Sequence, residues 1–167
     1  MAQMKILILV RHAKSEWSNE HLPDLFRPLN PRGNMDAPKM ATRIKSLGAH
    51  PDILICSPAV RAYSTALYFA SAFSIPADAI QTYSQFYHTD AETYLKIFHK
   101  LNNEAQSCMA FGHNPMITEL SNSMGKLRTD NVPTCGVLAW SFPCNKWNEI
   151  KPGTGTLLYY EYPKGQT

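Results

Sequence analysis

The chain has 167 residues, and its 16 lysines and arginines against 13 aspartates and glutamates give a formal charge of +3 with neutral histidines. This length predicts one domain over residues 1–167, since domains usually contain about 100–200 residues. The 44% apolar and 17% charged composition excludes a disordered chain, and the small net charge gives no reason to expect a nucleic-acid or membrane partner.

Short apolar runs alternate with amphipathic segments along most of the sequence. The apolar runs predict strands at residues 5–10, 52–56, 107–112, 137–142 and 157–162. The segments between them predict helices at about residues 31–47, 58–73, 91–101 and 115–124. This alternation predicts an α/β fold with a mostly parallel sheet that helices cover on both faces.

Capping residues support the predicted helix starts. The residues expected to act as N-caps are Asn30, Ser57, Asp90 and Asn114. Three of them are followed by proline, which favours the first helical position. Pro38 lies inside the first predicted helix, so we expect it to kink this helix or to delay its start.

Signals for a membrane, a metal or a nucleotide cofactor are missing from the sequence. The apolar run at residues 6–10 is far shorter than the ~20 residues of a membrane helix, and it lacks the pattern of a signal peptide, which favours a cytoplasmic location. The four cysteines lack the spacing of zinc ligands, and neither common glycine-rich phosphate-binding motif occurs. We therefore expect no metal and no cofactor.

Polar clusters follow three of the predicted strands directly. Arg11 and His12 follow the first strand, Arg61 lies shortly after the second, and His113 follows the third. The carboxyl ends of parallel strands lie at one edge of a sheet, so these four side chains should converge there. Helix N-termini at the same edge favour an anion, and arginines bind phosphate oxygens in a forked geometry. The sequence therefore predicts a phosphoryl site.

The residue types at this edge indicate phosphoryl transfer through a histidine. Neutral His12 is the candidate nucleophile, and a backbone carbonyl is expected to fix its other ring nitrogen. Arg11, Arg61 and His113 would neutralise charge on the phosphoryl oxygens, with Ser15 as a further candidate phosphate ligand. Water would then hydrolyse the phosphohistidine without a metal.

The same motifs resemble a known family. Residues 11–12 (RH), 57–66 (SPAVRAYSTA) and 112–115 (GHNP) look like the three signatures of the histidine phosphatase superfamily, which includes phosphoglycerate-mutase-like enzymes. The short chain, residues 11–17 (RHAKSEW) and residues 27–33 (RPLNPRG) are closer still to its SixA-type phosphohistidine phosphatases. The resemblance implies a three-layer α/β/α sandwich.

By the same resemblance, His12 is the phosphoacceptor, and Arg11, Arg61 and His113 bind phosphate. Ala13 stands where many relatives have glycine, a small change that close relatives share.

The general acid is the open point of the mechanism. Relatives that act on phosphate esters usually have an acidic residue between the second and third motifs. The candidates there are His88 and Glu92, while Asp90 is better explained as a helix cap. SixA-type enzymes resemble a site without a dedicated acid, which suits a labile P–N bond.

The leading hypothesis is a phosphatase that removes phosphate from phosphohistidine on a partner protein. One alternative is a phosphatase or mutase for a small phosphorylated metabolite, although 167 residues leave little room for the insertions of mutases. Another is a phosphate-binding module without turnover. Of the nearby residues, Lys14 is expected in the pocket or in solvent. Arg27 and Arg32 are expected to be surface charges, with the alternative that a loop near the site uses either of them to bind a substrate.

Overall fold

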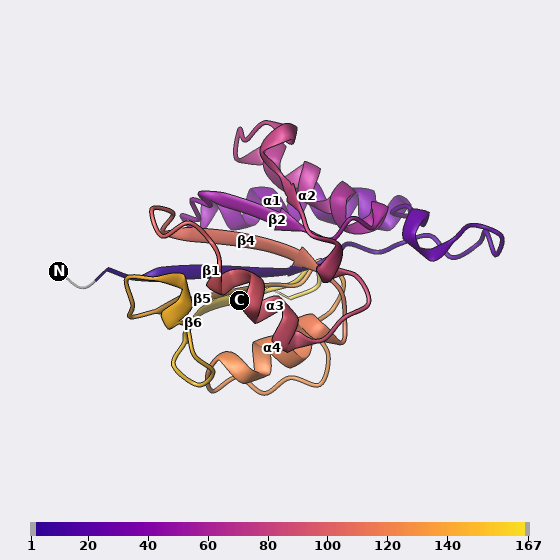
Figure 1. The fold of residues 1–167 in the computed structure, drawn as a ribbon. Coiled ribbons are helices and arrows are strands. Elements are labelled where there is room, and N and C mark those ends of the chain that lie inside the picture. The colour runs from indigo at the N-terminus through magenta and orange to yellow at the C-terminus, as the bar shows by residue number, and fades with distance from the viewer. Residues whose placement is uncertain (1–2, 166–167) are drawn as a thin grey trace.

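A six-stranded sheet forms the centre of the molecule, in a computed structural model that describes residues 3–165 (Figure 1). The strand order is β3-β2-β4-β1-β5-β6. The strands are β1 (Lys5–Arg11), β2 (Ile53–Cys56), β3 (Gln81–Thr82), β4 (Ser107–Gly112), β5 (Val137–Phe142) and β6 (Thr156–Glu161). The first four strands pair in parallel, and β5 runs antiparallel to both β1 and β6. The prediction of a mostly parallel sheet is confirmed.

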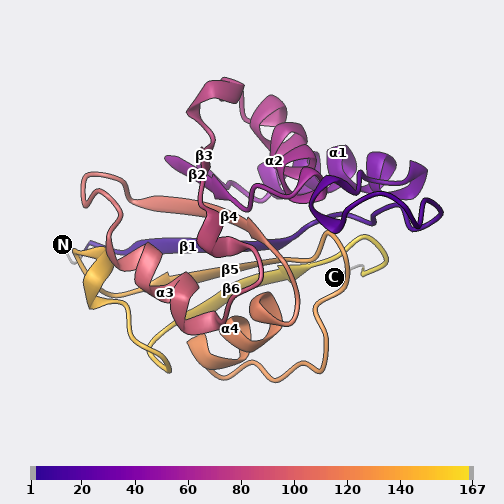
Figure 2. The ribbon, with the colours of Figure 1, turned by 45° about the vertical axis from the view of Figure 1, so that its right-hand side comes forward.

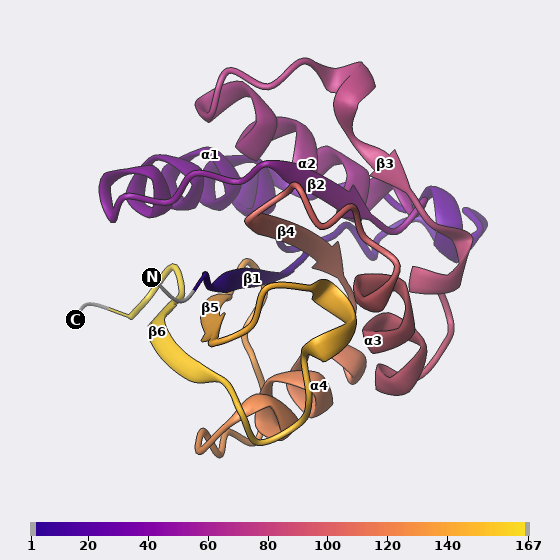
Figure 3. The same cartoon turned by 60° about the vertical axis from the view of Figure 1, so that its left-hand side comes forward.

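Two helices cover each face of the sheet, which gives three layers (Figure 3). One pair is α1 (Pro31–Ser46) and α2 (Val60–Ala72), and the other is α3 (Ala91–His99) and α4 (Met116–Met124). Side chains of β1 alternate between the two cores, as strand geometry requires. Leu7 and Leu9 pack in the core under α3 and α4, and Ile8 packs in the core under α1 and α2.

The register between β1 and β4, the two central strands, places the residues that follow them side by side. Arg11 at the end of β1 is paired with Gly112 at the end of β4. His12 and His113 therefore follow directly on neighbouring strands, and the His12 N–H donates to the Gly112 carbonyl at 3.1 Å. The loop from β1 to α1 extends beyond this edge of the sheet (Figure 2).

The expectation that Pro38 delays the first helix is wrong. The Asn30 side chain accepts a hydrogen bond from Gly33 N–H at 2.8 Å, Pro31 occupies the first turn, and α1 continues through Pro38. The missing N–H of Pro38 costs one helical bond. Burial of one face of α1 against the sheet offsets that loss, since packing supplies most helix stability in proteins.

Two of the predicted N-caps lie outside the helices they were expected to cap. The α2 helix begins at Val60 and α4 begins at Met116, with Ala59 and Pro115 at their N-cap positions. The side-chain oxygen Oδ1 of Asn114 still accepts from Thr118 N–H at 3.2 Å in the first turn of α4. Asn30 and Asp90 are confirmed as caps by their bonds to Gly33 and Thr93. Within residues 3–165, no helix has both the length and the apolar character needed to cross a bilayer.

Candidate active site

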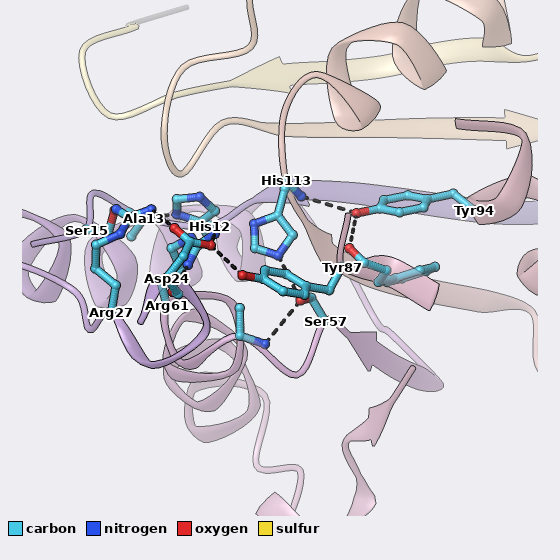
Figure 4. Close-up of polar contacts among 12 residues, drawn as sticks. His12, Ala13, Ser15, Asp24, Arg27, Ser57, Arg61, Tyr87, Tyr94 and His113 are labelled. Atoms are coloured by element: carbon cyan, nitrogen blue, oxygen red, sulfur yellow. Dashed lines mark hydrogen bonds and ion pairs between the residues drawn. The ribbon is translucent and has the colours of Figure 1, made fainter. Parts of the chain in front are cut away.

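The carboxyl ends of β1 and β4 and the start of α2 open into one cleft of ≈ 430 Å³. Its lining residues are Arg11, His12, Lys14, Ser15, Trp17, Arg27, Arg61, Tyr87, His88, His113, Asn114, Met116 and Thr134. The His12 and His113 rings lie with their centroids 5.2 Å apart (Figure 4). The structure thus brings together the four side chains that the motifs predicted to converge.

His12 is buried and held in one tautomer. Its Nδ1 lies 2.7 Å from the carbonyl oxygen of Ala13, to which it donates, so Nε2 keeps its lone pair. Burial lowers the pKa of His12 to about 3, and the positive charge of Arg61 acts in the same direction, against the opposing bond to Ala13. The ring is therefore neutral at pH 7, as a nucleophile requires.

His113 faces His12 and is also neutral. Its Nε2 lies 2.8 Å from the Ser57 hydroxyl oxygen, which itself accepts the Ala59 N–H at 3.2 Å. The Ser57 hydroxyl can donate its proton to His113 Nε2, and in that arrangement the ring proton lies on Nδ1. Burial lowers the pKa of His113 to about 3, with Arg61 acting in the same direction.

Three buried nitrogens of this cleft have no hydrogen-bond partner among the described residues: Nε of Arg11, Nε of Arg61 and Nδ1 of His113. Other nitrogens of the same arginines are bonded, with Arg11 Nη1 donating to the Val132 carbonyl at 2.8 Å and Arg61 Nη1 donating to the Asp24 carbonyl at 2.7 Å. Buried polar groups are normally paired. Three unpaired donors in one cleft therefore form a cradle for the oxygens of an anion.

Arg27 belongs to the cleft, contrary to the expectation of a surface charge. It is buried, donates to the Ser15 hydroxyl, and lies 3.6 Å from the ring centroid of Trp17. The Ser15 hydroxyl thus contacts Arg27 within the cleft. Arg32 is half exposed on α1 and pairs with Asp36 at 3.2 Å, in agreement with a surface role. The likeness of residues 27–33 to SixA-type enzymes was the sequence feature that pointed to a role for Arg27 at the site.

Asp24 was missed by the sequence reasoning. Its carboxylate accepts hydrogen bonds from Arg61 Nη2 at 2.9 Å, Arg27 Nη2 at 2.8 Å and the Tyr87 hydroxyl at 2.6 Å. Burial alone would raise the pKa of Asp24, but these three donors outweigh it and hold that pKa below its usual range. The signal that could have found it is the three-residue spacing from Asp24 to Arg27, which one 3₁₀ turn brings together.

The two candidate acids take different positions. His88 lines the cleft and its ring contacts the Tyr87 ring in a tilted arrangement, with ring centroids 3.9 Å apart. Glu92 is exposed in the first turn of α3 and pairs with Lys96 at 3.2 Å, so the structure places it outside the cleft. Over residues 3–165, no cluster of three or more His, Cys, Asp or Glu side chains could hold a metal ion.

The sequence matches the profile of the histidine phosphatase superfamily (branch 1) over residues 7–94, just over half of the chain. A chloroplastic protein of Arabidopsis thaliana, described as uncharacterized, is 44% identical over 59 residues. That segment covers 35% of this chain and 27% of the plant protein.

Solved structures with the same fold match nearly the whole chain. The SixA protein from Agrobacterium tumefaciens is 26% identical, with a TM-score of 0.79 over 95% of this chain and 98% of its own. The protein histidine phosphatase SixA in complex with tungstate is 19% identical, with a TM-score of 0.78 over 95% and 97% of the two chains. Its identity is low enough that it supports the fold alone. The matched profile, the shared three-layer fold and the cleft together show that the chain is a phosphatase and belongs to the histidine phosphatase superfamily, with a SixA-like architecture.

Proposed function

We propose that the protein hydrolyses a phosphoryl group through a covalent intermediate on His12, without a metal, and that its substrate is phosphohistidine on a partner protein. The observation that carries the proposal is the anion cradle of Arg11, Arg61 and His113 beside a neutral His12. Hydrogen-bond donors that the protein holds in fixed positions are preorganised for an oxyanion.

In the first step, phosphoryl oxygens accept hydrogen bonds from the cradle. His12 Nε2 attacks phosphorus, the bond from phosphorus to the leaving group breaks, and its electron pair stays with the leaving atom. Arg11 and Arg61 keep their positive charge and stabilise the charge that spreads over the equatorial oxygens. Water then attacks the phosphorus of phosphorylated His12. The bond between phosphorus and Nε2 breaks, which releases phosphate and restores the imidazole.

A P–N substrate suits the acid–base groups of the cleft. Asp24, the carboxylate bonded to Arg27 and Arg61, is held in its ionised form and is a poor proton donor. An alkoxide leaving group needs a proton from an acidic group of the cleft. An imidazole that is already protonated at its other nitrogen needs none, because it leaves as a neutral ring. The 26% identity to a SixA protein agrees with this substrate class.

Phosphohistidine trapping tests the mechanism. The protein is mixed briefly with a histidine-phosphorylated protein, quenched in alkali and mapped by mass spectrometry. Phosphate on His12 is expected, together with loss of turnover in His12→Ala and full activity in EDTA. Phosphate on another residue, or full activity in His12→Ala, would overturn the covalent mechanism.

Substrate preference is tested separately. Rates on the histidine-phosphorylated protein are compared with rates on a panel of sugar phosphates. Faster hydrolysis of the phosphohistidine protein is expected. Turnover of a sugar phosphate alone would leave the phosphatase intact and replace its proposed substrate with a small metabolite.

A further inference from the structure

Asp24 is open to solvent and is bonded to residues of the cleft. The cradle is buried, with exposed fractions of 5% for Arg61 and 6% for His113, whereas the Asp24 side chain is 42% exposed. Asp24 is nevertheless bonded to Arg61 and Tyr87, both of which line the cleft (Figure 4). A substrate protein enters from solvent with its phosphoryl group foremost. Its leaving group must therefore lie toward the solvent side of the cleft. Asp24 does not itself line the cleft, but its carboxylate is bonded to three residues that do, Arg27, Arg61 and Tyr87.

The Asp24 carboxylate retains capacity to accept a further hydrogen bond. Oδ2 receives two donors, from Arg61 and Tyr87, while Oδ1 receives one, from Arg27. An ionised carboxylate offers about four acceptor positions, two on each oxygen. Oδ1 therefore has one position to spare on a side chain that solvent reaches.

We propose that Asp24 is a specificity-determining residue that selects an N-phosphorylated imidazole as substrate. It does so by accepting a hydrogen bond, through Oδ1, from the ring N–H that lies away from the phosphoryl group. This inference rests on the proposed function, because it describes how the leaving group of that reaction is recognised.

The chemistry of the leaving ring gives this hydrogen bond its value. When His12 Nε2 forms its bond to phosphorus, the P–N bond of the substrate breaks and the electron pair returns to the substrate nitrogen. If the other ring nitrogen carries a proton, the product is a neutral imidazole. Without that proton the product is an imidazolide anion, a far stronger base and a poorer leaving group. The negative charge of Asp24 favours the protonated ring.

The same carboxylate disfavours small phosphorylated acids. A substrate that carries a carboxylate beside its phosphoryl group would bring a second negative charge close to Asp24, and like charges repel at short range. Asp24 thus favours a substrate with a cationic ring and disfavours a substrate with a negative charge beside its phosphoryl group.

The test compares two substrates in Asp24→Asn. The substrates are a 3-phosphohistidine peptide, whose ring can donate to Asp24, and 4-nitrophenyl phosphate, whose leaving group has no N–H and needs no proton. The ratio of kcat/KM for the peptide to kcat/KM for the ester is expected to fall at least ~10-fold, since a hydrogen bond to a charged acceptor is lost. Asp78→Asn, at an exposed site in another loop, is the matched control and should leave the ratio unchanged.

Orthovanadate separates recognition of the leaving group from support of the arginines. Vanadate occupies the phosphoryl position and has no leaving ring. If Asp24→Asn weakens vanadate binding by as much as it lowers kcat/KM for the peptide, Asp24 only holds Arg27 and Arg61, and the inference is overturned. An unchanged substrate ratio overturns it as well.

The pH profile supplies a second readout. The groups around the outer cleft are Arg27 and Arg61, Tyr87, whose pKa is raised, and the imidazoles His88 and His113. A carboxylate raises the pKa of the substrate ring. In Asp24→Asn the loss of kcat/KM for the peptide at alkaline pH should therefore begin at lower pH than in the wild-type protein. If kcat/KM for the peptide falls at the same alkaline pH in both proteins, the proposal is contradicted. Absence of phosphate on His12 in the wild-type protein would instead refute the proposed function itself, whatever Asp24 does.

Discussion

The Ser57 hydroxyl oxygen lies 2.8 Å from Nε2 of His113, which joins the residue after β2 to the residue after β4. This contact decides which nitrogen of His113 carries the proton that faces the anion cradle. Ser57 therefore acts on the phosphoryl group through His113, as a positioning residue.

Replacement of Ser57 by alanine should allow the other His113 tautomer. We expect kcat/KM to fall ~10-fold, since a buried nitrogen loses its partner and the cradle loses part of its Nδ1–H donor. ¹⁵N chemical shifts of His113 distinguish the tautomers, and should show Nδ1–H in the wild-type protein and a mixture in Ser57→Ala. Ser64→Ala on α2 is the control and should change neither quantity. An unchanged ¹⁵N spectrum in Ser57→Ala would exclude this role of the hydroxyl.

Arg27 and Arg32 form a matched pair of arginines in one motif. Arg27→Ala removes a buried guanidinium from the cleft, so orthovanadate should bind ~10-fold or more weakly. Arg32→Ala removes a half-exposed charge that pairs with Asp36, and it should bind vanadate as the wild type does. Isothermal titration calorimetry measures both. Equal affinities in the two variants would remove Arg27 from the anion site.

Stability should fall steeply in mild acid because of the two buried histidines. The folded pKa values of His12 and His113 are about 3, against about 6.5 in the unfolded chain. Below pH 6.5 the unfolded state binds protons that the folded state does not, so the free energy of unfolding falls as pH falls towards 4. The slope reaches at most about 2.7 kcal/mol per pH unit for two such groups.

Urea unfolding at several pH values measures this slope. In His12→Asn the slope between pH 6 and pH 4.5 should fall by about half, while His21→Asn, at an exposed site, should keep it. A wild-type free energy that stays constant over this range would show that His12 and His113 protonate normally in the folded state.

Gly33 allows α1 to approach the loop that carries Lys14 and Ser15. A Cβ atom at Gly33 would lie 2.1 Å from the Lys14 carbonyl oxygen, a backbone atom that also accepts the Asn30 N–H. Gly33→Ala should therefore lower stability by about 1–3 kcal/mol and lower kcat/KM, because the loop must move. Thermal denaturation and steady-state kinetics test this. Met35→Ala, at an exposed position of the same helix, should have little effect on either.

Sequence alone was sufficient for five of the six strands and for the convergence at their ends, but it missed β3 (Gln81–Thr82), whose two residues are exposed and form no apolar run. A buried parallel strand leaves a local signature, a short β-branched apolar run, and the topology then places the following residues together. The N-cap positions predicted at Ser57 and Asn114 were wrong, because α2 and α4 begin later, at Val60 and Met116. The Ser57 hydroxyl contacts His113, whereas the Asn114 side chain still accepts the Thr118 N–H in the first turn of α4.

The places of Arg27 and Asp24 in the site depend on a tertiary contact. An isolated bridge between Ser15 and Leu29 closes the loop after β1, and this closure buries Arg27 and carries Asp24 to Arg61 on α2. Loop closure is set by the tertiary structure, so the local signs were weak: a motif similarity for Arg27, and the three-residue spacing to Arg27 for Asp24.

The pairing of Arg11 with Gly112 has a consequence for how the enzyme can lose activity. His12 and His113 are spaced by a backbone ladder in the middle of the sheet, whose strands lie about 4.8 Å apart, and not by a flexible loop. The two rings can separate only if β1 and β4 part, which requires the most protected part of the fold to open. Partial unfolding at the periphery should therefore spare the spacing of the histidines, and inactivation by denaturant should coincide with collapse of the central sheet.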